Sequence, residues 1–272
     1  MTGASSRRRW TRGAALLVLV TALTGCSGGS NRDTAATAAA APATRSGSPR
    51  STAAAAPPRS TEPSPSLSRA QSVALPVPHL QQLPELKNGC EVTSLAMLLA
   101  AVGHPVDKLA LVARMPVDPT PVTFRPGGTG LLDVQRWGDP RSGFVGNVHS
   151  YIGYGIYAPA LLRLLDQQLP RRGVNLTGQP FDAVLEHIAA GTPVLAWTTT
   201  TFRPTTTWVT WQSPTGPVRA TPYEHAVVVS GYDSTHLLIA DPLSDDPVTT
   251  VDRTAFEQAW QQLGQQAITV AS

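Results

Sequence analysis

The chain is poor in two features that often reveal what a protein does, cysteine and long apolar runs. Its 272 residues include two cysteines, Cys26 and Cys90. Two thiols this far apart in the sequence do not make a thiolate-rich zinc site. The apolar run 14–23 has about ten residues, whereas a helix that spans a membrane needs about twenty. The sequence therefore predicts neither a structural zinc module nor a membrane span at this run.

Basic charge is missing from the part of the chain that can fold. The whole sequence has a net charge of +3, but residues 71–272 hold 12 Lys and Arg against 16 Asp and Glu, a net charge of −4. The positive charge therefore belongs to the first 70 residues. Because a nucleic-acid-binding domain needs a basic surface, we exclude that class.

A phosphate-binding loop is also missing. The glycine run 127–130 is not followed by Lys and Ser or Thr, so a nucleotide site is not expected there. The surrounding passage, 115–157, is rich in Pro and Gly, and it either forms the wall of a binding cleft or merely covers the core. The residues that we predict for a substrate cleft are Glu91, Trp137, Gly143, Asn147 and Glu224.

The N-terminal region has the features of an export signal. Residues 1–25 have a basic start and an apolar run, and they end in Leu-Thr-Gly before Cys26. This ending resembles the lipobox of bacterial lipoproteins, which implies that Cys26 is acylated. Residues 26–70 are mostly Ala, Pro, Ser and Thr and predict a disordered tether. We expect a domain anchored by lipid to the outer face of a bacterial cell membrane, exported by either the general or the twin-arginine route.

The stretch from Gln81 to Gly103 is where catalysis is most strongly indicated. Apolar residues at helical spacing predict an amphipathic helix that begins near Cys90, with Asn88 as N-cap and Glu91 completing a capping box. The first turn of a helix favours a thiolate over a thiol. With Cys26 acylated, Cys90 has no disulfide partner, so it is either a reactive thiol or a small buried apolar residue.

The remainder of the folded part alternates between helical and extended patterns. Apolar spacing, prolines and glycines predict helices over 106–114, 159–168, 181–190 and 256–263, and strands over 174–176, 194–199, 225–231, 236–240 and 266–270. The Thr- and Trp-rich run 200–218 predicts an exposed hairpin. These elements indicate an α+β fold.

Two of these strands bring a histidine close to a carboxylate. A hairpin register that pairs His225 with Asp241 also pairs Gly231 with Thr235 across a three-residue loop, a common length. Taken singly, His225 can be explained as a histidine at the end of a strand, and Asp241 as a turn residue before Pro242. Together with Cys90 they supply a nucleophile, a base and a group that orients the base. The Cys90 N–H and the amide of Gln82, or else of Gln81, would hold an oxyanion.

Several passages together carry a family resemblance. They are residues 82–97 around Cys90, Gly143-Phe-Val-Gly, Ala190-Gly-Thr-Pro-Val through Trp197, Glu224-His225 through Asp233, and Asp241-Pro242. On these passages the chain resembles papain-like cysteine peptidases, specifically the secreted bacterial branch similar to peptidase family thirty-nine. The resemblance implies a papain-like α+β fold over residues 71–272, in which a helix carrying Cys90 packs against an antiparallel sheet carrying His225 and Asp241. It also implies hydrolysis of peptide bonds by a Cys-His-Asp triad without a metal. We further expect a monomer that needs no cofactor.

The sequence departs from the family pattern at two points. Gln82 lies eight residues before Cys90, whereas papain-like enzymes usually place this glutamine six before. The transporter domains of bacteriocin-processing enzymes are not in this sequence, so their substrate is not carried over. Two alternatives remain. One is an amidase or transpeptidase acting on cell-wall peptides with the same triad, although the Asp-Cys-Ser-Gly motif of such enzymes is missing. The other is a papain-like module that binds a partner without catalysis.

Overall fold

Two apolar strands that are buried along nearly their whole length organise the fold. The strands β7 (Val194–Thr199) and β10 (Glu224–Tyr232) pair antiparallel at the centre of a seven-stranded sheet. The structure is a computed structural model that describes residues 72–271. The predicted signal over 1–25, the acylated Cys26 and the tether lie outside the described residues, and within them no helix is long and apolar enough to cross a membrane.

Every strand pair in the large sheet is antiparallel. The order is β12-β11-β10-β7-β13-β6, and β1 also pairs with β10. Beside β7 and β10, its strands are β1 (Val73–Ala74), β6 (Gly173–Asn175), β11 (His236–Ala240), β12 (Thr249–Asp252) and β13 (Ala267–Val270).

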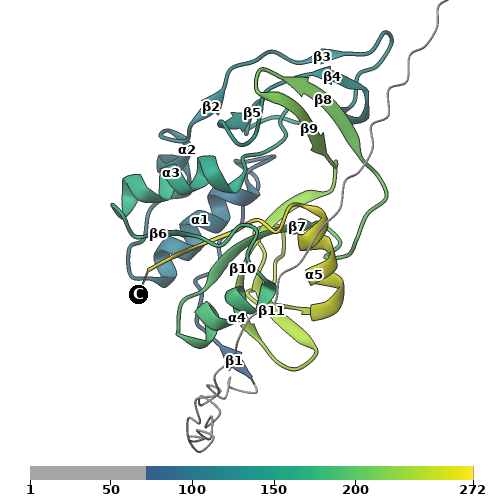
Figure 1. Cartoon of the computed structure of the whole chain (residues 1–272). Coiled ribbons are helices and arrows are strands. Elements are labelled where there is room, and N and C mark those ends of the chain that lie inside the picture. The colour runs from purple at the N-terminus through teal and green to yellow at the C-terminus, as the bar shows by residue number, and fades with distance from the viewer. Residues whose placement is uncertain (1–71, 272) are drawn as a thin grey trace, which may run out of the picture. The chain divides into compact units, whose positions relative to one another are not determined.

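Helices cover the sheet on both faces, as Figure 1 shows. On one face lie α1 (Cys90–Ala101) and α3 (Ala158–Gln168), and α2 (Lys108–Val112) packs beside α1. On the other face lie α4 (Phe181–Ala189) and α5 (Arg253–Gln262). The alternation of side chains along β10 explains the two layers, because Ala226 and Val228 belong to the α1–α3 core, whereas Val227 and Val229 belong to the α4–α5 core.

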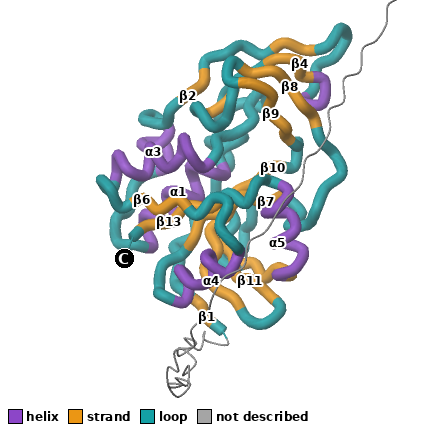
Figure 2. Tube along the Cα trace, in the orientation of Figure 1, coloured by secondary structure: helices purple, strands orange, loops and turns teal. Residues whose placement is uncertain are grey.

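The passage 115–157 contributes to two smaller sheets. A parallel pair joins β2 (Val117–Asp118) to β5 (Phe144–Val145). A four-stranded sheet contains β3 (Thr123–Phe124), β4 (Val134–Arg136), β8 (Val209–Ser213) and β9 (Gly216–Ala220), with the short helix η1 (Leu131–Asp133) before β4. Figure 2 shows β4, β8 and β9 side by side, above α3 and the large sheet.

Local predictions failed where tertiary contacts decided the outcome. The predicted exposed hairpin over 200–218 is the pair β8–β9, and its Trp211 is completely buried. The helix α1 is not amphipathic: residues 90–99 are all buried, because the sheet and other segments surround it. Asn88 is not its N-cap. That position is Gly89, with no side-chain cap, while Asn88 donates its amide hydrogen bond to the Ser150 carbonyl.

Candidate functional site

Cys90 is the first residue of α1, and this helix is fixed to an open stretch of the edge of β10. The strand β11 ends at Ala240, which pairs with Val228, so Ala226 lies beyond it. The Ser94 hydroxyl donates to the Ala226 carbonyl at 3.0 Å, and the backbone of Ala226 lies near enough to Cys90 to act against the rise of the thiol pKa. Residues four apart lie on one face of a helix, so Cys90 and Ser94 hold α1 at this edge.

His225 and Asp241 form a close pair, as the sequence predicts. The His225 Nε2 lies 2.7 Å from Asp241 Oδ1, and both side chains are buried. Burial raises the pKa of Asp241, but the hydrogen bond and charge interaction with His225 outweigh it and leave the pKa below its usual value. The Leu243 N–H also donates to this carboxylate at 2.9 Å. Because Asp241 occupies Nε2, His225 keeps Nδ1 for a proton-transfer partner.

The hairpin register that we predicted from the sequence is wrong, although the two residues still meet. Near the turn, Tyr232 pairs with Leu237 and Gly231 with Leu238, but beyond an irregularity at Ser230 the pairing is Val229 with Ile239. A bulge inserts one residue into a strand and so changes which face the following side chains occupy. The irregularity at Ser230 therefore places the side chain of Asp241 on the same face of the sheet as that of His225.

The Cys90 thiol is paired with a carboxylate in this structure. Its sulfur donates to Glu91 Oε2 at 3.3 Å, and among residues 72–271 this is the side chain that accepts from it. Burial raises the pKa of Cys90 well above its ordinary value, and the charges of Glu91 and Glu224 raise it further. We expected the start of the helix to favour a thiolate. The structure shows the opposite, because burial and two carboxyl groups outweigh the helix dipole.

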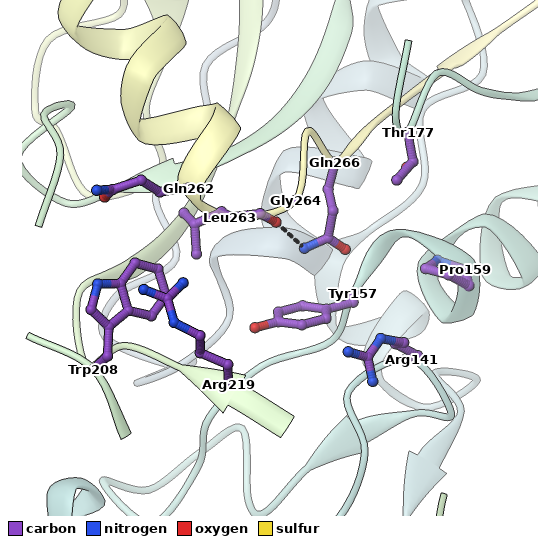
Figure 3. A pocket seen from close by; sticks show the side chains of 10 residues that line it. All are labelled: Arg141, Tyr157, Pro159, Thr177, Trp208, Arg219, Gln262, Leu263, Gly264 and Gln266. Carbon is purple, nitrogen blue, oxygen red and sulfur yellow. Dashed lines mark hydrogen bonds between the residues drawn. The ribbon is translucent and has the colours of Figure 1, made fainter. Parts of the chain in front are cut away.

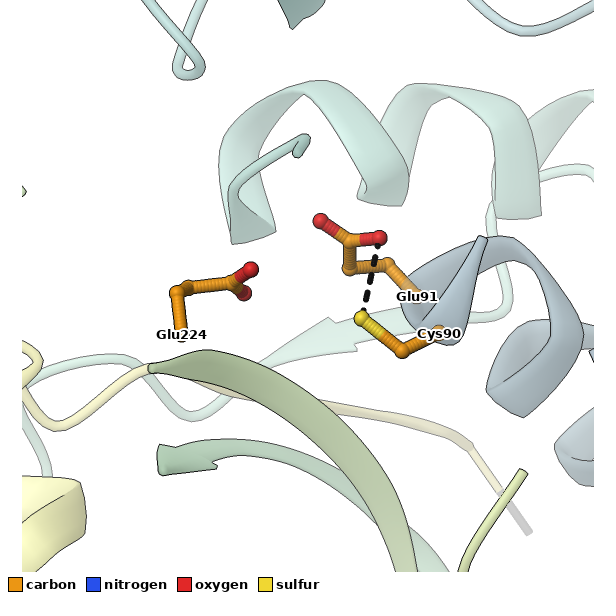
Figure 4. Close-up of side chains that lie close together, drawn as sticks. All are labelled: Cys90, Glu91 and Glu224. Carbon is orange, nitrogen blue, oxygen red and sulfur yellow. Dashed lines mark hydrogen bonds between the residues drawn. The ribbon is translucent and has the colours of Figure 1, made fainter. Parts of the chain in front are cut away.

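Glu91 and Glu224 face each other beside the thiol. Figure 4 shows Glu224 reaching from the start of β10 towards Glu91 and Cys90 at the start of α1. Glu91 does not reach back to a cap; its Oε1 accepts from the Ile156 N–H at 2.7 Å. Burial raises the pKa of Glu91 to about 7, and burial together with Glu91 raises that of Glu224 well above its usual range. At neutral pH the pair therefore holds at least part of a proton.

The side chains of Cys90, Glu91 and Glu224 are close enough together to bind one metal ion. One ligand atom from each of Cys90, Glu91 and Glu224 lies within 4.8 Å of the others. All three groups have raised pKa values, and metal ligation would require each to lose its proton. The prediction that the protein uses no metal stays a prediction.

The two glutamines before Cys90 have different surroundings. Gln82 is buried, and its amide nitrogen donates to the carbonyls of Leu86 and Lys87 at 3.3 Å each, so it supports the loop that leads into α1. The Gln82 N–H also donates to the Pro242 carbonyl at 2.9 Å. Gln81 is exposed, and its amide donates to Asp245 at 2.6 Å. Of the two, Gln82 is therefore the one beside the Cys90 and Asp241 segments.

The residues predicted for a substrate cleft have scattered positions. Glu91 is fully buried, and Trp137 packs in the core against Trp211 with ring centroids 5.8 Å apart. Gly143 is buried against the backbone of β2. Asn147 is exposed and, with Trp137, lines a cavity of about 480 Å³ beside β2. Glu224 is half-buried beside Cys90. Ser94, which positions Cys90, was not predicted, although its spacing of one helical turn was visible.

Comparison with known proteins identifies the family. The model of the Peptidase_C39 like family matches residues 74–268, nearly all of the described part of the chain. The chain belongs to this family. It is 38% identical over 187 residues to the uncharacterized protein YvpB of Bacillus subtilis strain 168, which covers 69% of this chain and 70% of that protein.

A solved structure confirms the fold. The chain is similar to a Bacillus anthracis protein that carries the description C39-like peptidase, with 40% sequence identity and a TM-score of 0.66. The match covers 74% of this chain and 98% of that protein. The predicted papain-like α+β fold of a C39-like peptidase, with a Cys90 helix on an antiparallel sheet, is therefore confirmed.

Proposed function

We propose that this protein hydrolyses peptide bonds with a Cys90–His225–Asp241 triad. The observation that carries the proposal is the 2.7 Å pair between His225 and Asp241, with Cys90 held beside the next residue of β10, Ala226. A buried carboxylate on one imidazole nitrogen fixes the tautomer and supports the positive charge that follows proton transfer. Membership of a peptidase family supports the same activity.

The proposed reaction gives each residue a separate role. The His225 Nδ1 takes the Cys90 proton, and the thiolate attacks the carbonyl carbon of the peptide to form an oxyanion. The Cys90 N–H and the Gln82 amide hold the oxyanion, and Gln82 gives up one of its hydrogen bonds to the Leu86 and Lys87 carbonyls to do so. The imidazolium then protonates the leaving amine as the C–N bond breaks. Water hydrolyses the acyl-enzyme with His225 as base and releases the carboxylate product. For the first step, Cys90 exchanges its hydrogen bond to Glu91 for one to His225.

A binding module is the second candidate, and a specific observation favours it. The thiol is held by Glu91 and its pKa is raised, which suits a protein that keeps the scaffold without the chemistry. In either case we propose that the protein acts on the outer face of the cell membrane, attached through an acylated Cys26. For the catalytic candidate we propose a monomer that needs no cofactor.

Thiol labelling decides between the two candidates. The full chain in a Cys26→Ser background has Cys90 as its single thiol, and a thiol-directed covalent probe reports its reactivity across pH. For a peptidase we expect labelling below the free thiol pKa of about 8.5, lost in His225→Ala and reduced in Asp241→Asn. Exposed His236→Ala is the matched control. Equal labelling with and without His225 contradicts the triad, and cleavage of a mixed peptide pool by the wild type but not by Cys90→Ala establishes hydrolysis.

A further inference from the structure

A cavity of about 300 Å³ lies between the four-stranded sheet, the start of α3 and the end of α5. Figure 3 shows Arg219 and Arg141 on one side of it, with the Tyr157 ring between them and Gln266 opposite. None of the described residues that line it is acidic. This is notable in a part of the chain whose net charge is negative.

Arg219 is fixed in place and has no carboxylate partner within residues 72–271. Its guanidinium carbon lies 3.4 Å from the centroid of the Trp208 ring, a stacked cation–π arrangement. The indole N–H of Trp208 donates to the Thr205 carbonyl at 3.1 Å, so the ring itself is held. Stacking uses the face of a guanidinium and leaves its N–H donors free along the edge. The N–H groups of the Arg219 guanidinium are thus held in a fixed orientation, and no carboxylate among residues 72–271 neutralises their charge.

The second arginine has part of its charge already neutralised. Arg141 forms an ion pair with Asp139 at 3.2 Å, although half of its side chain is exposed. Burial raises the pKa of Tyr157, so its hydroxyl stays neutral and adds no negative charge. The local charge is therefore closer to one positive charge than to two. A planar carboxylate with a single charge matches one free guanidinium fork better than a doubly charged phosphate does.

The cavity is separated from Cys90 by a pair of tyrosines. The hydroxyl of Tyr157 lies 2.7 Å from that of Tyr154. Both tyrosines are close enough to Glu224 for its charge to raise their pKa values, and Glu224 lies beside Cys90. Four residues lie between Arg219 and Glu224 along the chain. Tyr157 therefore lines the cavity and also lies next to the group that contains Glu224 and Cys90.

We propose that this cavity binds the carboxylate of an acidic peptide, with Arg219 as the main ligand and Arg141 in support. Its use as a substrate subsite rests on the proposed peptidase function, whereas its affinity for a carboxylate does not. The Trp208 indole N–H reports on occupancy, because the ring contacts Arg219 directly.

The binding test uses the full chain and two blocked amino acids that differ in one group. N-acetyl-glutamic acid α-amide has one carboxylate, and N-acetyl-glutamine α-amide has none. In nitrogen–proton correlation spectra we expect the first to shift the Trp208 indole signal saturably and the second to leave it unchanged. Arg219→Gln should weaken binding by roughly tenfold or more, as expected when a charge-assisted hydrogen bond is lost. Arg136→Gln removes one charge from an exposed position of the same sheet and should leave the affinity unchanged.

Three results would overturn the proposal: equal binding of the two compounds, equal weakening by both arginine variants, or tighter binding of inorganic phosphate than of the carboxylate. The subsite role has a separate test, in which hydrolysis of a Glu-containing peptide is compared with that of its Gln counterpart. We expect a higher kcat/KM for the acidic peptide, and we expect Arg219→Gln to remove the difference. A chain that binds the carboxylate but cleaves neither peptide refutes the peptidase function and the subsite role, and leaves the carboxylate site standing.

Discussion

At the scale of single residues, the thiol of Cys90 has acidic neighbours. Glu91 accepts the hydrogen bond of the thiol, and a carboxyl oxygen of Glu224 lies within 4.8 Å of the sulfur. Gly155 packs against the two carboxyl groups, and a Cβ at this position would come within 2.3 Å of Glu91 Oε1. A negative charge beside a thiol disfavours the thiolate. These two carboxyl groups therefore oppose ionisation of the candidate nucleophile.

Replacing one carboxyl group should release the thiol. We expect Glu91→Gln to lower the pKa of Cys90 and to raise its labelling rate at pH 7 severalfold, because the variant removes a negative charge from beside the sulfur. The measurement is the rate of reaction with a thiol probe in the Cys26→Ser background. Glu186→Gln, at an exposed position of α4, is the matched control. Slower labelling of Glu91→Gln would show that Glu91 promotes ionisation of the thiol instead of opposing it.

At the scale of elements, α1 replaces the missing continuation of β11. Beyond Ala240 this edge of β10 has no strand partner among residues 72–271, and the Ala226 carbonyl accepts from the Ser94 hydroxyl instead. Buried backbone groups without partners are costly, so this contact fixes the position of the helix. It also places the first residue of α1 near Ala226, the residue that follows His225 in β10.

The contribution of the Ser94–Ala226 hydrogen bond to stability can be measured by removing the hydroxyl of Ser94 and, separately, that of its neighbour Thr93. Ser94→Ala leaves the Ala226 carbonyl without its buried donor and should lower the free energy of unfolding by about 1–3 kcal/mol. Thr93→Val is the matched control, since the Thr93 hydroxyl is buried without a hydrogen-bond partner, and we expect it to be neutral or stabilising. Urea denaturation of the three proteins provides the values. The reverse order of stabilities would exclude Ser94 as the anchor of α1.

At the scale of the whole molecule, the buried acidic pair links stability to pH. In the unfolded chain Glu91 titrates near 4.5, whereas burial in the folded protein raises its pKa to about 7. Between these values the folded protein binds more protons than the unfolded chain, so stability falls as pH rises. The pKa of Glu224 is raised as well and acts in the same direction.

Urea denaturation between pH 4.5 and 7.5 tests this linkage. The contribution of Glu91 to the free energy of unfolding should fall by roughly 3 kcal/mol across this range, the equivalent of the difference between its two pKa values. Glu91→Gln should lose this fall. Other groups that titrate here are common to both proteins, so the difference between the two curves isolates the acidic pair. Parallel curves would mean that Glu91 is ionised throughout.

The sequence by itself determined the elements and the identity of the candidate triad. Apolar spacing predicts the strand 194–199 with the bounds that the structure has, and it predicts α3 and α4 to within one residue at each end. The sequence also predicts that His225 pairs with Asp241, because the two residues lie on strands that follow each other in the chain. Patterns of this kind depend on residues that are near in sequence.

Only the tertiary structure decided the state of the site. Three features decide it: the bulge at Ser230, the hydrogen bond from Ser94 to Ala226, and the contact between Glu91 and Glu224. Local sequence patterns do not predict them, because each depends on how separate strands and helices pack together. The pKa of Cys90 depends on burial and on charges brought from distant segments. For this reason the helix start alone predicted a lowered pKa for Cys90, whereas burial and the two carboxyl groups raise it.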